Sequence, residues 1–103
     1  MWNVSNVEDM PWMFMESKFN NNISGWNVYN VTNMESMFEK SVFNRDISKW
    51  NVYNVRNMFK MFADSNFNQD ISGWNVDNVE YYDKIFYLCP IIYDYKPERF
   101  IYE

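Results

Sequence analysis

A period of 24 residues organises the whole sequence. Tryptophan recurs at this spacing, at Trp2, Trp26, Trp50 and Trp74. Cutting the chain there gives units 2–25, 26–49, 50–73 and 74–97, followed by a tail at 98–103. The first three units agree at 13 of 24 positions without a gap, and the fourth keeps six of those positions. Because so short a unit cannot bury its own apolar face, the units must stack and share one core. The sequence therefore predicts a single repeat domain over residues 1–103, with the fourth unit and the tail capping one end.

Each unit carries two apolar periods, which predict two kinds of local structure. Trp50 and Val52 are two residues apart, as on one face of a short strand. Met34, Met37 and Phe38 have the i, i+3, i+4 spacing of one helix face. Parallel strands joined by crossovers on one side build a coiled stack. The expected fold class is thus an α/β repeat solenoid of about four 24-residue repeats, with short parallel strands and short helices.

Composition narrows the chemistry. The absence of histidine removes any imidazole base or metal ligand, and the single cysteine, Cys89, excludes an internal disulfide and a cysteine-based metal site. We therefore expect no catalytic residues, no metal, no cofactor and no enzyme activity. Cys89 lies in the apolar fourth unit, so we expect a buried, unreactive thiol.

Charge and hydropathy restrict partners and location. The net charge is −5 and the isoelectric point is near 4.6, which argues against a nucleic-acid partner. No apolar run approaches the ~20 residues of a membrane-spanning helix. The first residues lack the basic and apolar segments of a signal peptide. We expect no membrane insertion, and we favour the cytoplasm of a producing or infected cell, or a virion, over secretion.

Asparagine falls into regular columns, meaning sets of residues 24 apart. The predicted structural ladder consists of Asn3, Asn27, Asn51 and Asn75. A second column at the bend consists of Asn6, Asn30, Asn54 and Asn78. Repeated asparagine in a stacked fold forms side-chain ladders or Asx turns, and ligand contact is the alternative. We expect asparagine, rather than the scarce glycine, to take the bends.

Positions that vary between units indicate a binding face. Tyr29 and Tyr53 are equivalent residues of neighbouring units, with Lys49 and Arg56 close by in sequence and Asp77 next in the column. Tyrosine beside a cation is a common composition of protein interfaces. The alternative is that tyrosine simply packs well on an exposed sheet. We predict that these five residues bind a protein partner of unknown identity.

The N-terminal unit has extra apolar residues. The candidate self-association edge consists of Trp2, Val4, Met10, Trp12 and Met15. Trp12 and Met15 stand where the next two units have smaller or charged residues. An uncapped stack exposes an open edge and part of its core, which suits association. We expect a homodimer through this edge, or docking to another repeat domain.

The unit as a whole resembles a known repeat. Its residues run Ile47, Trp50, Val52, Val55, Met58, Met61 and Phe62, and Phe67-Asn68-Gln69-Asp70-Ile71-Ser72 closes it. This pattern resembles the BspA-type leucine-rich-repeat surface protein family, also described as a mycoplasma lipoprotein repeat and a domain of unknown function. The match covers residues 2–80, and Tyr82 and Ile85 depart from it by replacing two methionines.

The resemblance implies both a fold and a function. The implied fold is a leucine-rich-repeat-like right-handed coil. Family members are mostly bacterial surface and adhesion proteins, and similar repeats occur in large DNA viruses. The implied function is a non-catalytic protein–protein interaction or adhesion module. The alternative is a structural component of a virion or surface that assembles through its uncapped N-terminal edge.

Overall fold

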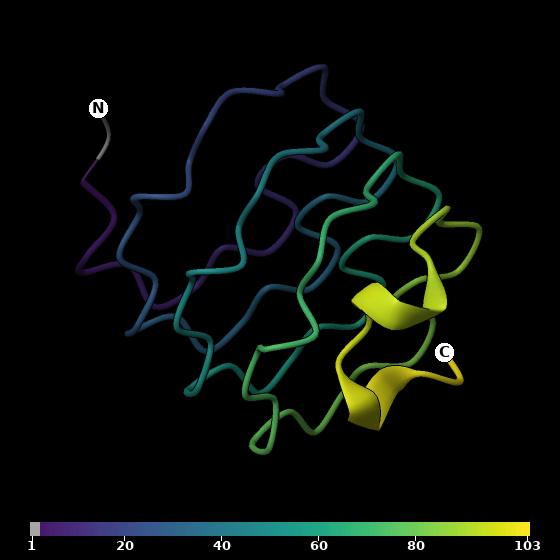
Figure 1. Cartoon of the computed structure of the whole chain (residues 1–103). Helices are drawn as coiled ribbons and strands as arrows, with labels where there is room; N and C mark the ends of the chain where they lie inside the picture. The colour runs from purple at the N-terminus through teal and green to yellow at the C-terminus, as the bar shows by residue number, and fades with distance from the viewer. Residues whose placement is uncertain (1–2) are drawn as a thin grey trace.

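The chain forms a series of stacked, irregular loops. The computed structural model describes residues 3–103, so Trp2 of the predicted self-association edge lies outside the described residues. Three isolated parallel bridges join Asp9 to Asn33, Asn33 to Asn57 and Asn57 to Tyr81. Each unit therefore lies beside the next in chain order, and Figure 1 shows the stack running from the N-terminal unit to the C-terminal tail.

Regular secondary structure is nearly absent, so the expected α/β repeat solenoid is wrong. Across residues 3–103 there is no α-helix and no β-strand. The helical segments of that range are two short 3₁₀ helices, η1 (Tyr93–Tyr95) and η2 (Glu98–Phe100). The bridges are isolated and make no sheet. The leucine-rich-repeat-like coil of strands and helices is accordingly not supported.

Hydrogen bonds explain why residues 34–41 form no helix. Alternate amides, those of Met34, Ser36, Phe38 and Lys40, donate to the next unit, to the carbonyls of Asn57, Phe59, Met61 and Ala63 at 2.8–2.9 Å. The amides of residues 37, 39 and 41 instead donate to carbonyls three residues back. An α-helix requires every amide to donate four residues back. Routing alternate amides out of the unit is incompatible with that pattern.

The same arrangement recurs along the stack. We call residues 10–17, 34–41, 58–65 and 82–89 the turn segments. The amides of residues 10, 12, 14 and 16 donate to the carbonyls of residues 33, 35, 37 and 39, and those of 58, 60, 62 and 64 donate to 81, 83, 85 and 87. The turn segments thus replace the predicted helices with a ladder between units.

Core residues are buried in columns, as the repeat predicts. The rings of Trp26, Trp50 and Trp74 stack with centroids 6.4 and 6.5 Å apart and planes within 5° of parallel. Phe38 lies between Phe14 and Phe62, with both centroids 5.6 Å away. The indoles of Trp50 and Trp74 also bond to the preceding unit, and Nε1 of Trp50 donates to the Ile23 carbonyl at 3.0 Å. Trp74 does the same to Ile47 at 3.1 Å.

The tail covers the C-terminal end of the core. Phe100 in η2 is fully buried and stacks on Tyr82 at 4.6 Å. Arg99 donates from Nη1 to the Val76 carbonyl at 2.5 Å. Figure 1 shows both short helices, in yellow, against this end of the stack.

Candidate interaction surfaces

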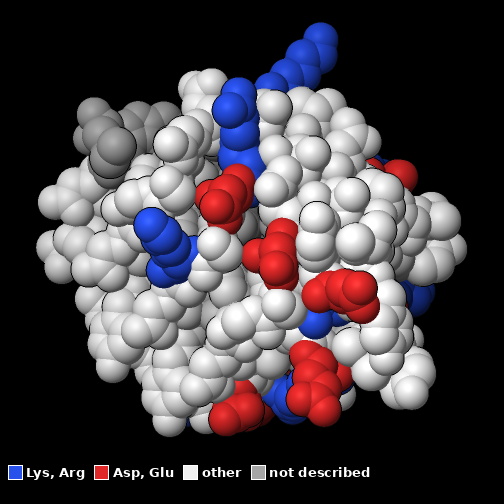
Figure 2. All heavy atoms as spheres, in the orientation of Figure 1, with Lys and Arg blue, Asp and Glu red and all other residues white. Residues whose placement is uncertain are grey.

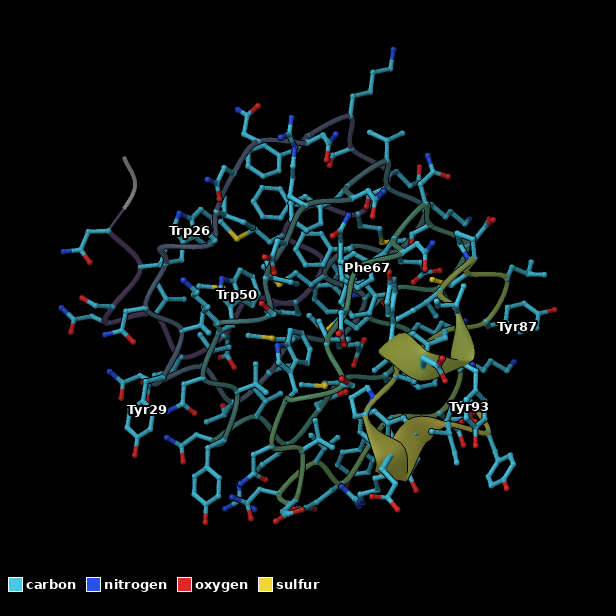
Figure 3. The ribbon with its side chains drawn as sticks, viewed as in Figure 1. Trp26, Tyr29, Trp50, Phe67, Tyr87 and Tyr93 are labelled. Atoms are coloured by element: carbon cyan, nitrogen blue, oxygen red, sulfur yellow. The ribbon has the colours of Figure 1, made fainter. Side chains whose placement is uncertain are left out.

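Two equivalent tyrosines project from the middle of the stack. Tyr29 is 46% exposed and Tyr53 is 44% exposed. In Figure 3, Tyr29 points outward from the edge of the stack, away from the stacked core rings. Its carbonyl accepts a hydrogen bond from Nδ2 of Asn54 at 2.8 Å, which ties its unit to the next. The structure therefore holds the backbone of this face rigidly while it leaves the phenol rings accessible.

The two asparagine columns have different roles at this face. In the predicted ladder column, the side-chain oxygens of Asn3, Asn27, Asn51 and Asn75 accept from the amide two residues later at 3.0–3.1 Å. These are Asx turns within a unit. The bonds between units come from Nδ2 of Asn30, Asn54 and Asn78, which reach a carbonyl 25 residues earlier at 2.8–2.9 Å.

A polar hollow of about 280 Å³ lies along the bend column that follows the tyrosines. It is lined by Asn6, Glu8, Asn30, Thr32, Asn54, Arg56 and Asn78. Arg56 forms an exposed ion pair with Glu80, with Nη1 and Oε1 2.8 Å apart. Such an exposed pair contributes little to stability, so the guanidinium can exchange that carboxylate for one of a partner.

The predicted partner-binding residues are divided among three hollows. Arg56 lines the hollow beside the tyrosine column. Lys49 lines a second hollow of about 270 Å³ with Arg45 and Asp46. Asp77 lines a third of about 510 Å³ next to the tail residue Arg99. Asp77 continues the column of Tyr29 and Tyr53 into the fourth unit, with the same Asx turn, and Lys49 lines a separate hollow.

Sequence reasoning missed part of the first hollow. Glu8 and Thr32 stand 48 and 24 residues before Arg56 in one column, and Thr32 Oγ1 donates to the Glu8 carbonyl at 3.3 Å. The repeat could have identified Glu8 and Thr32, because these residues occupy the position of Arg56 in earlier units and that position varies in residue type. Figure 2 shows basic and acidic side chains interspersed over the visible face.

Two loop carboxylates are held by neighbouring serines. Asp46 accepts from the Ser48 amide at 2.8 Å, and Asp70 accepts from the Ser72 amide at 3.0 Å and its hydroxyl at 2.7 Å. The bonds from Ser48 lower the pKa of Asp46, and those from Ser72 lower the pKa of Asp70. Asn22, the equivalent residue of the first unit, makes the same bond to Ser24 at 2.9 Å. The loop requires an acceptor oxygen and not a charge.

Cys89 has the environment of a structural thiol. Its Sγ donates to the Phe67 carbonyl at 3.2 Å, and burial raises the pKa of the thiol. Within residues 3–103, no three histidine, cysteine, aspartate or glutamate side chains gather where they could hold a metal ion. No helix formed by these residues has the length and apolar character to cross a bilayer.

The predicted self-association edge is only partly exposed. Val4 is 6% exposed and Met10 is 3% exposed, so both belong to the core rather than to the surface of the edge. Met15 is half-buried. Trp12 is 55% exposed, and the neighbouring Met13, which was not among the predicted residues, is 37% exposed. Among the described residues of the first unit, the large apolar side chains that are exposed are Trp12 and Met13.

Comparison with known proteins identifies one family. The family model described as "Mycoplasma protein of unknown function, DUF285" matches residues 1–94. No curated protein and no solved structure matches the chain.

Proposed function

We propose that this chain, which belongs to the DUF285 family of mycoplasma proteins of unknown function, is a non-catalytic protein-binding module. The observation that carries the proposal is the pair Tyr29 and Tyr53, which are 46% and 44% exposed on the rigid middle of the stack. They lie beside the polar hollow that contains Arg56. Tyrosine and arginine are enriched at the energetic centres of protein interfaces.

The position of the tyrosines makes their exposure informative. Tyr29 and Tyr53 belong to internal units, which have a neighbouring unit on each side. A missing neighbour therefore does not explain why their side chains are exposed. Their backbone amides are fixed by Asn27 and Asn51, at 3.0 and 3.1 Å. A rigid backbone and a side chain with few rotatable bonds lose little conformational entropy on binding. This face is therefore organised for recognition before a partner arrives.

The resemblance to BspA-type surface proteins also supports a binding role. That resemblance rests on the Trp50–Phe62 pattern and on Phe67–Ser72, and the members of that family are mostly bacterial surface and adhesion proteins. We propose a protein as the partner because the hollow pairs hydrogen-bonding amides with a charged arginine and the adjacent phenol rings supply apolar area.

A pair of double variants tests the proposal. Tyr29→Ala/Tyr53→Ala removes both rings, and we expect at least a tenfold loss of the proteins that the immobilised wild-type chain retains from a lysate of its source cell. Tyr93→Ala/Tyr102→Ala, at residues 58% and 90% exposed in η1 and in the tail, is the matched control and should retain them. The melting temperatures of both variants should stay close to that of wild type.

Two results would contradict the proposal. The first is an identical set of retained proteins for wild type and Tyr29→Ala/Tyr53→Ala. The second is retention that persists after the lysate has been digested with protease, which would mean that the ligand is not a protein.

Self-assembly through the N-terminal edge is the second candidate function. It is favoured by the exposure of Trp12 and Met13 on the first unit. Solitary exposed apolar side chains are common, but the residues equivalent to Met13 are fully buried in the next two units.

A further inference from the structure

The first turn segment carries a row of unused backbone acceptors. In the second unit, the carbonyls of residues 33, 35, 37 and 39 each accept an amide from the unit before. Their equivalents in the first unit, the carbonyls of residues 9, 11, 13 and 15, accept no hydrogen bond from any described residue. The N-terminal end of the stack thus presents four acceptors in a fixed row.

The last turn segment carries the complementary row of donors. The amides of residues 58, 60, 62 and 64 donate to the fourth unit. Their equivalents at residues 82, 84, 86 and 88 donate to no acceptor in the described part of the chain. The C-terminal end therefore presents four donors with the spacing that matches the four acceptors.

A second column shows the same complementarity with opposite polarity. The Thr32 amide donates to the Glu8 carbonyl, the Arg56 amide to Thr32, and the Glu80 amide to Arg56, at 2.7–2.8 Å. At the ends of this column, the Glu8 amide and the Glu80 carbonyl have no partner among residues 3–103. Every inter-unit backbone bond of these two columns could thus continue from one copy into another.

Apolar side chains accompany both rows. Met13 is 37% exposed, whereas Met37 and Met61 in the same column are fully buried. At the other end Leu88 is 67% exposed and Tyr87 is 54% exposed. Figure 3 shows Tyr87 pointing outward beside the tail at the C-terminal end.

We propose that copies of this chain associate head to tail, with the donors of residues 82–88 of one copy facing the acceptors of residues 9–15 of the next. The proposal deepens the second candidate function and does not depend on the tyrosine face. It also replaces the symmetric homodimer of the sequence analysis. Two N-terminal ends facing each other would place acceptor rows against acceptor rows and leave carbonyls unsatisfied.

The tail leaves room for this contact at the rim. Phe100 stacks on the side chain of Tyr82, and Nζ of Lys96, just before the tail, lies 5.4 Å from the Phe86 ring centroid, so both contact side chains of the segment. The tail accepts no hydrogen bond from the donor row. Contact would therefore use the backbone rim and the exposed Leu88 and Trp12, rather than extend the core.

Blocking one end at a time separates head-to-tail from symmetric association. Trp12→Glu blocks the N-terminal end and Leu88→Glu blocks the C-terminal end. In sedimentation at hundreds of micromolar, wild type should form species larger than a dimer, and each variant alone should be a monomer. An equimolar mixture of the two variants should form a one-to-one dimer, because each supplies the end that the other has lost. Tyr53→Glu, in the middle of the stack, should associate like wild type.

Three outcomes would overturn the proposal. If Leu88→Glu stays dimeric while Trp12→Glu is monomeric, association is symmetric through the N-terminal end, and the second candidate function stands without the head-to-tail geometry. If Trp12→Glu stays dimeric while Leu88→Glu is monomeric, association is symmetric through the C-terminal end. A wild type that is monomeric at all concentrations refutes both self-assembly and its geometry, and leaves the tyrosine face untouched.

Cross-linking provides a second readout if a glutamate variant fails to fold. Residue 88 belongs to the same column as residue 16, so the proposed register places the two side by side across the contact. Glu16→Cys and Leu88→Cys, each in a Cys89→Ser background, are mixed and oxidised. Head-to-tail contact predicts disulfide-linked heterodimers of the two variants and no homodimers. Homodimers of either variant alone would contradict it.

Discussion

Among residues 3–103, eight that are not glycine adopt left-handed backbone conformations. They have φ between 53° and 58° and are Trp12, Glu16, Ser36, Lys40, Lys60, Asp64, Lys84 and Leu88. This conformation costs roughly 1–2 kcal/mol for an L-residue. Six of these residues donate their amides to the next unit, and the other two belong to the unused donor row. The left-handed turn directs the amide along the stack, so hydrogen bonds between units offset its cost.

Neither glycine serves this purpose. Gly25 and Gly73 have ordinary backbone angles, and a Cβ at either position would meet nothing within 4 Å. The expectation that asparagine takes the bends describes the Asx turns at Asn27 and Asn51. It could not locate the left-handed residues, because tryptophan, glutamate and leucine carry no local preference for that conformation.

Acid should destabilise the protein through Asp46 and Asp70. Serine hydrogen bonds lower both folded-state pKa values below the ordinary 3.8. The two carboxylates therefore contribute to the free energy of unfolding when the pH is above their unfolded-state pKa. This contribution is lost as the pH falls through their folded-state pKa. We expect the free energy of unfolding, measured in urea, to fall below about pH 4. Asp46→Asn/Asp70→Asn should reduce this fall and leave stability at pH 7 nearly unchanged.

The first unit shows why an asparagine should be tolerated in place of Asp46 or Asp70. Asn22 makes the equivalent bond to Ser24 with a neutral amide oxygen. An acid dependence of unfolding that is identical in wild type and the double variant would show that the two carboxylates do not contribute to it.

For the turn segments, the sequence predicted which side chains are buried but not the conformation of the backbone. Met34, Met37 and Phe38 are fully buried, as their spacing predicts. The same spacing is met by two consecutive tight turns with alternate amides directed outward, so the periodicity identified the buried face and not the backbone conformation. Hydrogen-bond partners 23 residues away leave no local sequence signal.

The candidate site was predictable to a similar extent. Tyr29 and Tyr53 could be identified as variable positions within the repeat, and the structure leaves both accessible. Asp77 follows Tyr53 in the same column, as the period predicts, whereas Lys49 lines another hollow, because the irregular loops do not keep residues near in sequence on one face. A strand would have placed alternate residues together.

A pair of methionines from one column tests the shared core. Met61 is fully buried between neighbouring units, whereas Met13 is 37% exposed at the end of the stack. We expect Met61→Ala to lower the free energy of unfolding by about 2–5 kcal/mol. Met13→Ala should cost clearly less, since it buries less surface and leaves no closed cavity. Chemical denaturation of both variants measures the difference.

Equal costs for the two substitutions would contradict a core built from stacked columns. They would mean that the end unit is as enclosed as the middle of the molecule.

At the scale of the whole molecule, cohesion comes from bonds between neighbouring units. Turn-segment amides, asparagine side chains and tryptophan indoles all connect residues about 24 apart. Each unit therefore depends on its neighbours for both core and hydrogen bonds. The 24-residue period predicted this dependence, and the first and fourth units show its consequence, because complementary rows there have no partner among the described residues.

The central claim is that alternate amides of the turn segments bond to the next unit instead of closing a helix. Scalar couplings across hydrogen bonds, measured by nuclear magnetic resonance on the ¹⁵N,¹³C-labelled chain, identify each amide and its acceptor carbonyl directly. The structure predicts correlations from the Ser36 amide to the Phe59 carbonyl and from the Phe38 amide to the Met61 carbonyl. A correlation from the Phe38 amide to the Met34 carbonyl, four residues back, would show a helix and contradict the account.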